Sequence, residues 1–356
     1  MENWQSILIS PDSTVLDAVK TIDRNNPLLT AVVVDADRHL LGTVTDGDIR
    51  RGMLNHVPMD AEVTRIMHKT PIFVFDDTSK SELFNIFKKN PRCRVFPILD
   101  RQYRVIGIKT DQNSFSAEFE NPVLIMAGGL GTRLRPLTEE KPKPLLTIGE
   151  KPILEIILEN FMANGFRNFY ISVNYKAEMI EEYFGDGSGK GASITYLREN
   201  KRLGTAGSLS LLESTPDLPI IVMNGDLLTK VNFQKLLEFH ESNKFSATMC
   251  VREHNLEIPF GVARVNNGHL EALEEKPVNK MFVNAGIYAL NPEILNMVPR
   301  NRFYDMPELF SALLEKEKNP GVFPIREYWL DIGRMSEYEK ADKTYGEIFQ
   351  KEDLSA

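Results

Sequence analysis

An internal repeat in the first 113 residues constrains the fold of this chain more than any other feature. The stretch Leu41–Arg50 reappears about 65 residues later as Val105–Asn113. The two stretches align Gly42 with Gly107, Thr45 with Thr110 and Asp48 with Asn113. Each copy is predicted to form a helix, two short apolar strands and a further helix. The repeat therefore sets residues 1–113 apart as one unit.

The charge of the chain changes at the end of this repeat. Residues 1–113 carry 15 basic and 15 acidic residues, so the whole net charge of −8 belongs to residues 114–356. Residues 114–121 show neither a period of 2 nor of 3.6 and end in Asn-Pro, which predicts a linker. We therefore expect two domains, 1–113 and 122–356, joined by that linker. A length of 356 residues is also typical of two domains.

Apolar strands that alternate with helices are expected from residue 122 onward. Short apolar runs that are typical of buried strands occur at Val123–Ala127, Phe169–Val173, Ile194–Leu197, Ile220–Met223 and Ala247–Val251. Repeated strand–helix units of this kind predict an α/β fold with helices on both faces of a sheet. Such sheets place their binding sites beyond the carboxyl ends of the strands.

A glycine-rich loop follows the first of these runs. Its sequence is Gly128-Gly129-Leu130-Gly131-Thr132-Arg133. A glycine-rich turn at a strand end leaves backbone N–H groups free to face phosphate, and an arginine adds a forked cation. Leu134 replaces the third glycine of a dinucleotide fingerprint, which disfavours an NAD-linked oxidoreductase, and no P-loop Gly-Lys-Ser/Thr follows. The loop therefore predicts a phosphate site of another type.

Composition excludes several classes of protein. A net charge of −8 and a pI near 5.5 argue against sequence-independent nucleic-acid binding. No apolar run approaches the ~18 residues of a membrane span. The two cysteines, Cys93 and Cys250, form no CxxC pattern, so neither a disulfide framework nor a zinc site is expected. We expect a cytoplasmic protein that binds no nucleic acid and no membrane.

Residues 122–335 resemble the sugar-1-phosphate nucleotidyltransferase family. After the glycine-rich loop, further motifs follow in the order typical of that family: Lys141-Pro142-Lys143, Leu203-Gly204-Thr205-Ala206-Gly207, Asn224-Gly225-Asp226, Pro259-Phe260-Gly261-Val262, Glu274-Glu275-Lys276-Pro277, Asn284-Ala285-Gly286 and Trp329-Leu330-Asp331. The resemblance implies a Rossmann-like mixed sheet and attack of a sugar-1-phosphate on the α-phosphate of a nucleoside triphosphate. Pyrophosphate would be the second product.

The resemblance also implies a role for each matched residue. The catalytic cations would be Arg133 and Lys143, and Asp226 and Asp331 would hold a Mg²⁺ ion. Nucleotide binding is expected of Gly128, Gly129, Gly131, Thr132, Gly204, Thr205 and Ala206. Binding of the sugar and its phosphate is expected of Gly261, Glu275, Lys276, Asn284 and Gly286.

The base and the sugar are assigned from one loop. Residues 203–207 are most similar to the loop of enzymes that form GDP-mannose, so GTP is the expected nucleotide and mannose-1-phosphate or glucosamine-1-phosphate the expected sugar. The product would then serve surface glycan or nonulosonic acid biosynthesis. Uridylyl- and thymidylyltransferases share the scaffold and stay open as alternatives. A catalytically decayed nucleotide sensor is a further alternative.

The repeat in residues 1–113 resembles a tandem pair of CBS motifs. The resemblance implies that Thr45 contacts phosphate and Asp48 the ribose of an adenosine nucleotide, because a carboxylate can accept two hydroxyl hydrogen bonds. The second copy departs from the pattern at Asn113. A module that only holds copies of the chain together, as a homo-oligomer, is the alternative.

Overall fold

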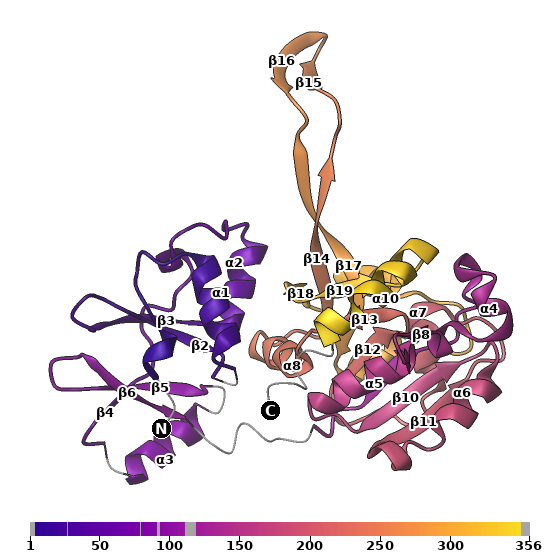
Figure 1. Ribbon diagram of the computed structural model, residues 1–356, viewed down its shortest axis with the longest axis horizontal. Coiled ribbons are helices and arrows are strands. Elements are labelled where there is room, and N and C mark those ends of the chain that lie inside the picture. Colours follow the sequence, from indigo (N-terminus) through magenta and orange to yellow (C-terminus); the bar gives the residue numbers. More distant parts are fainter. Residues whose placement is uncertain (1–3, 27, 79, 91–92, 111–118, 350–356) are drawn as a thin grey trace. The chain divides into compact units, whose positions relative to one another are not determined.

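The computed structural model describes residues 4–26, 28–78, 80–90, 93–110 and 119–349. The chain forms two compact units, residues 1–117 and 118–356 (Figure 1). Asn113 and most of the expected linker lie outside the described residues. The end of that segment packs on the second unit, where Phe119 stacks on Phe166 with ring centroids 5.0 Å apart and the Asn121 side chain donates to the Pro219 carbonyl at 2.8 Å.

The first unit contains two sheets of the same design. One has the order β1 (Leu8–Ile9), β2 (Thr30–Val34), β3 (Leu40–Thr45), and the other β4 (Val74–Phe75), β5 (Val95–Leu99), β6 (Val105–Thr110). In both, the first pair is parallel and the second antiparallel. Gly42 lies opposite Val33 and Gly107 opposite Ile98, each next to a register shift. The sequence repeat is therefore a structural repeat.

Helices pack beside these strands. They are α1 (Val15–Arg24), α2 (Asp46–Leu54) and α3 (Lys80–Lys89). The first two begin with the same capping box, Thr14 with Asp17 and Thr45 with Asp48, in which each side chain accepts from the other residue's backbone N–H. The helix expected after residue 110 in the second copy falls outside the described residues.

Backbone and side chains join the two halves of the first unit. The Leu40 N–H donates to the Tyr103 carbonyl at 3.2 Å, and the Val105 N–H donates to the Arg38 carbonyl at 2.8 Å. One apolar cluster draws buried side chains from both halves: Ile7, Leu28, Val32, Val34, Val95, Leu99 and Val105. Each fully buried side chain of this kind contributes about 1.5–3 kcal/mol. The two copies therefore share this apolar cluster.

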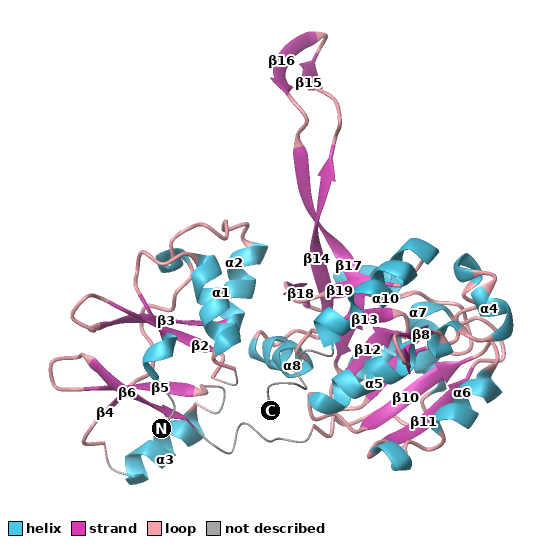
Figure 2. Cartoon of the chain, viewed as in Figure 1, coloured by secondary structure: helices cyan, strands magenta, loops and turns pink. Residues whose placement is uncertain are grey.

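The second unit is built on a mixed seven-stranded sheet (Figure 2). Its order is β11 (Ser193–Arg198), β10 (Asn168–Val173), β7 (Val123–Met126), β12 (Ile220–Asn224), β17 (Val278–Leu290), β14 (Ala247–Glu257) and β18 (Pro320–Ile325). The first four strands are mutually parallel, and β17 runs antiparallel to both of its neighbours. The fold is thus the mixed α/β class expected from the sequence, and five of its strands match the apolar runs.

Helices and paired strands complete the second unit. The helices are α4 (Leu137–Glu140), α5 (Ile153–Ala163), α6 (Ala177–Phe184), α7 (Gly204–Gly207), α8 (Phe233–Ser242), α9 (Met306–Glu315) and α10 (Met335–Phe349). The paired strands are β8 (Thr147–Ile148) with β9 (Lys151–Pro152), β13 (Leu227–Thr229) with β19 (Trp329–Asp331), and β15 (Val262–Asn266) with β16 (His269–Glu274).

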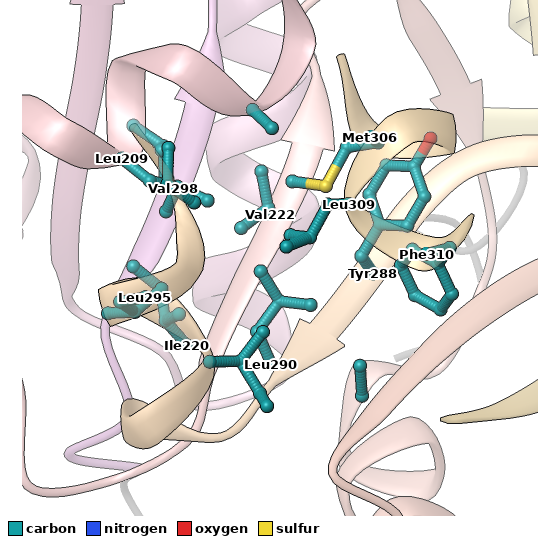
Figure 3. Close-up of a cluster of buried hydrophobic side chains, with 14 of the residues drawn as sticks. Leu209, Ile220, Val222, Tyr288, Leu290, Leu295, Val298, Met306, Leu309 and Phe310 are labelled. Carbon is teal, nitrogen blue, oxygen red and sulfur yellow. The ribbon is translucent and has the colours of Figure 1, made fainter. Parts of the chain in front are cut away.

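A buried apolar cluster joins α9 to the sheet (Figure 3). Met306, Leu309 and Phe310 of α9 contribute to the cluster together with Val222 of β12 and Tyr288 of β17. This packing holds the segment before α9 against the carboxyl ends of the parallel strands. That segment lines the site described next.

Candidate active site

A pocket of about 370 Å³ lies at the carboxyl ends of β7, β11 and β12. It is lined by Met126, Ala127, Gly128, Gly129, Arg133, Lys143, Pro144, Glu199, Arg202, Gly204, Thr205, Asn224, Gly225, Asp226, Phe303 and Asp305. This is the edge of the sheet where an α/β fold is expected to bind its ligand. Seven of the residues singled out from the sequence are in this lining.

The glycine-rich loop forms one wall of the pocket. Gly128 and Gly129 line it directly, whereas Gly131 and Thr132 lie in the following turn and are not part of the lining. Gly131 has φ +63°, and a Cβ there would lie 2.8 Å from the Thr138 side chain. Glycine at this position therefore allows a tight turn that presents Arg133 to the pocket.

An ion pair joins two motifs that are far apart in the sequence. Lys143 Nζ lies 2.5 Å from Asp226 Oδ2, and the two side chains are only 10% and 24% exposed. Gly225 lets this turn approach β7 closely, because a Cβ there would lie 2.6 Å from the Met126 carbonyl oxygen. The pairing places a cation and a carboxylate together at the floor of the pocket.

Asp331 lies next to this pair. It sits opposite Leu227 in the register of β13 and β19, and the Ile332 N–H donates to the Asp226 carbonyl at 2.9 Å. Burial and the nearby Asp226 carboxylate raise the pKa of Asp331, while Lys143 and Arg133 act in the opposite direction. Within the described residues, Asp331 Oδ1 is buried and has no hydrogen-bond partner.

These carboxylates fit a divalent cation that is completed by substrate oxygens. No group of three or more His, Cys, Asp or Glu side chains in the described part of the chain could hold a metal ion by itself. Two close carboxylates with a buried oxygen that lacks a partner instead suit a hard cation that keeps its other positions for phosphate and water. Asp226 and Asp331 are the residues that would hold it.

The loop Gly204–Gly207 is held against the segment before α9. The Thr205 N–H and hydroxyl both donate to Asp305 Oδ1, at 2.7 and 3.0 Å. Gly204 has φ +79°, and a Cβ there would lie 2.7 Å from Asp305 Oδ1. Gly204 and Thr205 line the pocket, whereas Ala206 is buried in the apolar core and does not line it.

The residues expected to bind the sugar are divided between two places. Gly286 lies next to the pocket, because a Cβ there would come 2.6 Å from the Asn224 amide nitrogen. Asn284 is close by and donates to the Tyr288 hydroxyl at 2.8 Å. The other three, Gly261, Glu275 and Lys276, lie on a β-hairpin that projects from the sheet and do not line the pocket (Figure 1).

In the first unit, Thr45 and Asp48 are joined to each other at the start of α2. The Thr45 hydroxyl and N–H donate to Asp48 Oδ2 at 2.6 and 2.8 Å, and Arg51 donates to Asp48 Oδ1 at 2.6 Å. Both oxygens of this carboxylate therefore already accept hydrogen bonds within the helix. A ribose would have to share or replace them.

Nine lining residues were not assigned a role from the sequence, and five of them carry polar or aromatic side chains: Glu199, Arg202, Asn224, Phe303 and Asp305. Glu199 lies two residues after the expected strand Ile194–Leu197, so its position near a strand end was an available signal. Asn224 belongs to a motif already noted. Phe303 and Asp305 come from a distant segment, and only the capping box of Asp305 with Glu308 marks it as the start of a helix.

The Glu199 carboxylate is held firmly at the pocket wall. Oε1 accepts from the Ser172 hydroxyl, and Oε2 accepts from the Leu203 N–H at 3.0 Å. A Cβ on Gly128 would lie 3.2 Å from Oε1. The carboxylate thus lies directly beside the glycine-rich loop, with lone pairs left for a ligand.

Comparison with known families identifies the second unit. The family described as Nucleotidyl transferase matches residues 122–347. The chain belongs to this family. The CBS domain matches residues 4–55 and 63–108 of the same chain, in agreement with the repeated sheets of the first unit.

Curated relatives of this nucleotidyl transferase carry related names. Mannose-1-phosphate guanyltransferase of Yarrowia lipolytica is 34% identical over 223 residues, which cover 60% of this chain and 61% of the relative. Probable mannose-1-phosphate guanylyltransferase 1 of Oryza sativa subsp. japonica is 34% identical over 247 residues, covering 64% and 65%. The chain therefore spans less than two thirds of the length of these relatives.

Solved structures show the same fold. A putative glucose-1-phosphate thymidylyltransferase from Bacillus anthracis matches with a TM-score of 0.52 at 22% identity, over 62% of this chain and 94% of that one. HddC from Yersinia pseudotuberculosis matches with a TM-score of 0.50 at 26% identity, over 63% and 99%. Among the described helices, none is long and apolar enough to span a membrane.

Proposed function

We propose that this nucleotidyl transferase moves GMP from GTP to a sugar-1-phosphate, releasing pyrophosphate and forming a GDP-sugar. The observation that carries the proposal is the convergence in one pocket of a glycine-rich loop, Arg133, and the Lys143–Asp226 pair next to Asp331. Both substrates are anions, so the chemistry requires neutralisation of charge and alignment more than a protein nucleophile. The cations and the glycine-rich loop of this pocket can neutralise the phosphate charge and align the two substrates.

Different residues of the chain bind different parts of the triphosphate. Backbone at Gly128 and Gly129 faces the phosphates, and Arg133 neutralises the departing pyrophosphate. Lys143 lies on the floor of the pocket, where charge develops at the α-phosphate. Its ion pair with Asp226 orients the ammonium group before substrate binds.

Asp226 and Asp331 would hold Mg²⁺, whose bound form neutralises phosphate charge and orients the reacting oxygens. The buried oxygen of Asp331 without a partner supports this assignment. Burial, and after it the Asp226 carboxylate, raise the pKa of Asp331, which is expected of a carboxylate that lacks a bound cation to neutralise it.

Glu199 supports guanine as the base. Guanine presents two adjacent donors, N1–H and the N2 amino group, whereas uracil and thymine present a single N–H between two carbonyl oxygens. A carboxylate only accepts hydrogen bonds, so it complements guanine. The relatives named as mannose-1-phosphate guanyltransferases support the same choice.

Mannose-1-phosphate or glucosamine-1-phosphate is the proposed acceptor, for surface glycan or nonulosonic acid biosynthesis. For the first unit we propose an adenosine nucleotide at the CBS pair, close to Thr45 and Asp48, and association of copies through this module. The match of both repeats to the CBS domain supports these proposals.

Pyrophosphate release tests the proposed reaction. GTP, UTP, CTP, dTTP and ATP are each combined with several sugar-1-phosphates in the presence of Mg²⁺. We expect turnover with GTP and mannose- or glucosamine-1-phosphate and little with the other nucleotides. Folded protein that releases no pyrophosphate with any pair of nucleotide and sugar-1-phosphate would refute the catalytic proposal. Turnover with UTP or dTTP in place of GTP would refute the assignment of the base.

A further inference from the structure

A short connection, residues 174–176, joins the carboxyl end of β10 to α6 (Figure 1). Its last residue, Lys176, has φ 52° and ψ 42°, in the left-handed region, and directly precedes the first residue of α6. Glycine or asparagine suits this conformation, and serine, threonine, aspartate or asparagine suits the start of a helix. Local backbone structure therefore does not account for a lysine here, whereas the contacts of its side chain do.

The Lys176 ammonium group caps the end of α4. Its Nζ donates to the Glu139 carbonyl and to the Glu140 carbonyl, each at 2.6 Å. The last carbonyls of a helix have no partner within the helix, and a lysine can satisfy them. The Tyr175 hydroxyl donates to the Thr138 carbonyl at 3.2 Å. Three successive carbonyls of α4 therefore accept hydrogen bonds from this connection.

Thr138 links α4 to the glycine-rich loop. Thr138 is 2% exposed, and its hydroxyl donates to the Gly131 carbonyl at 2.9 Å. A Cβ on Gly131 would lie 2.8 Å from the Thr138 side chain and 3.2 Å from the Lys143 Cβ, so these segments are packed closely. The turn after Gly131 carries Arg133, which lines the pocket. A displacement of α4 would therefore move the loop and Arg133 with it.

The same connection also restrains the pocket wall that carries Glu199. The Asn174 side-chain amide donates to the Glu199 carbonyl at 2.6 Å, and a Cβ on Gly128 would lie 3.3 Å from the Asn174 Cβ. Within the described part of the chain, the lining of the pocket includes none of residues 174–176. These residues therefore act on the pocket through the segments that they hold.

We propose that Lys176 is a positioning residue, which holds α4 and the glycine-rich loop in the arrangement that binds the triphosphate before the nucleotide arrives. The part played by the triphosphate rests on the function proposed above. Leu137, Glu139 and Glu140 of α4 are exposed, so the restraint on this helix depends on Thr138 and on the bonds to its carbonyls. Hydrogen bonds from a charged donor are the stronger ones.

Steady-state kinetics of Lys176→Met test this role. Methionine keeps an unbranched apolar side chain but lacks the ammonium group. We expect the KM for GTP to rise about 10-fold, because apparent affinity falls with the fraction of protein in the competent arrangement. The kcat and the KM for the sugar-1-phosphate should stay within about twofold of the wild-type values, because bound triphosphate restores the loop.

Two further lysine variants serve as controls. Lys176→Arg keeps a cation that can donate to both carbonyls, so it should retain most of the wild-type KM for GTP. Lys190 also lies over a tyrosine ring, but it pairs with the Glu155 side chain. Lys190→Met is therefore the matched control and should leave the KM for GTP unchanged.

Lys176→Gly separates the loss of the contact from the strain of the backbone. Glycine adopts the left-handed region without strain, so this variant should be at least as stable as Lys176→Met in thermal unfolding. It also lacks the ammonium group, so its KM for GTP should rise. A wild-type KM for GTP in Lys176→Gly would overturn the proposal. A fall in kcat of Lys176→Met with an unchanged KM for GTP would overturn it as well.

Hydrogen exchange of the protein without substrate gives a readout that does not depend on catalysis. The Leu134 and Glu139 N–H groups donate to the Gly131 and Pro136 carbonyls, both at 2.9 Å, so their exchange reports on the loop and on α4. We expect these amides to exchange faster in Lys176→Met than in the wild-type protein, with the amides of α8 unchanged. Equal exchange in the two proteins means that Lys176 does not hold the loop. If the wild-type protein releases no pyrophosphate but these amides exchange faster in Lys176→Met, the proposed function fails and the restraint by Lys176 stands.

Discussion

Replacing Glu199 by Gln changes the pocket by one charge and one hydrogen-bonding role at nearly constant shape. In the native structure each carboxylate oxygen accepts one hydrogen bond from the protein, from the Ser172 hydroxyl and the Leu203 N–H. Each oxygen keeps a lone pair for one of the two guanine donors. A glutamine places an amino group at one of these positions. That amino group is a donor, so it cannot accept the hydrogen bond that the carboxylate oxygen accepted from the Leu203 N–H or from a guanine N–H.

The size of the effect follows from these contacts. At least one hydrogen bond to a charged acceptor is lost, and such bonds contribute about 1.5–3 kcal/mol. This corresponds to a fall of roughly 10- to 150-fold in kcat/KM for GTP. Because glutamine pairs a donor with an acceptor, UTP and dTTP should be used as well as before or better.

The assay measures kcat/KM for GTP, ITP, UTP and dTTP with one sugar-1-phosphate. ITP lacks the N2 amino group, so wild-type protein should use it less well than GTP, and Glu199→Gln should reduce that difference. Glu182→Gln on α6, which is exposed, is the matched control. An unchanged ratio of GTP to UTP in Glu199→Gln would refute the idea that this carboxylate selects the base.

Three further predictions concern other parts of the chain. Asp226→Asn should lower turnover by about 100-fold or more, because it removes the charge that orients Lys143 and would hold Mg²⁺; pyrophosphate release measures this. Asp48→Ala and Asp17→Ala should each cost about 1 kcal/mol of stability through a lost capping box, but only Asp48→Ala should abolish binding of AMP or ATP in calorimetry. Burial lowers the pKa of His240 from its ordinary 6.5. As the pH falls, this histidine therefore binds a proton at a higher pH in the unfolded chain than in the folded chain. Stability is therefore full above about pH 6.5 and decreases as the pH falls below it, as Tm measurements from pH 7.5 to 5.5 should show.

Each of these predictions has an outcome that contradicts it. Wild-type turnover in Asp226→Asn would remove this residue from the site. Equal nucleotide binding by Asp48→Ala and Asp17→Ala would place the ligand elsewhere in the first unit. His240→Gln should flatten the pH dependence of Tm, with the exposed His254→Gln as control; an unchanged slope in the first variant would assign the dependence to other groups.

Features that depend on neighbouring residues could be predicted from the sequence. Val123–Met126 forms a strand and Ile153–Ala163 a helix, as their apolar spacing indicates. The turn at Gly131 follows from the conformational freedom of glycine. The repeat in the first unit was visible because two like sequences form two like sheets.

Contacts between distant segments could not be predicted in this way. Glu199 was passed over because nothing in its immediate sequence shows that the Ser172 hydroxyl and the Leu203 N–H hold its carboxylate. Lys276 stands in a motif that the sequence assigns to the sugar site, yet it lies on the hairpin before β17 begins and does not line the pocket. Strand pairing and register are properties of the whole sheet.

The sequence by itself determined the division into a repeated module and an α/β unit, and the phosphate-binding character of the glycine-rich loop. Periodicity and turn chemistry act over a few residues, so they can be read from the chain directly. Only the tertiary structure decided that Lys143 pairs with Asp226, 83 residues away, and that Thr205 binds Asp305, 100 residues away. These contacts depend on the order and register of strands, which packing of the whole core selects.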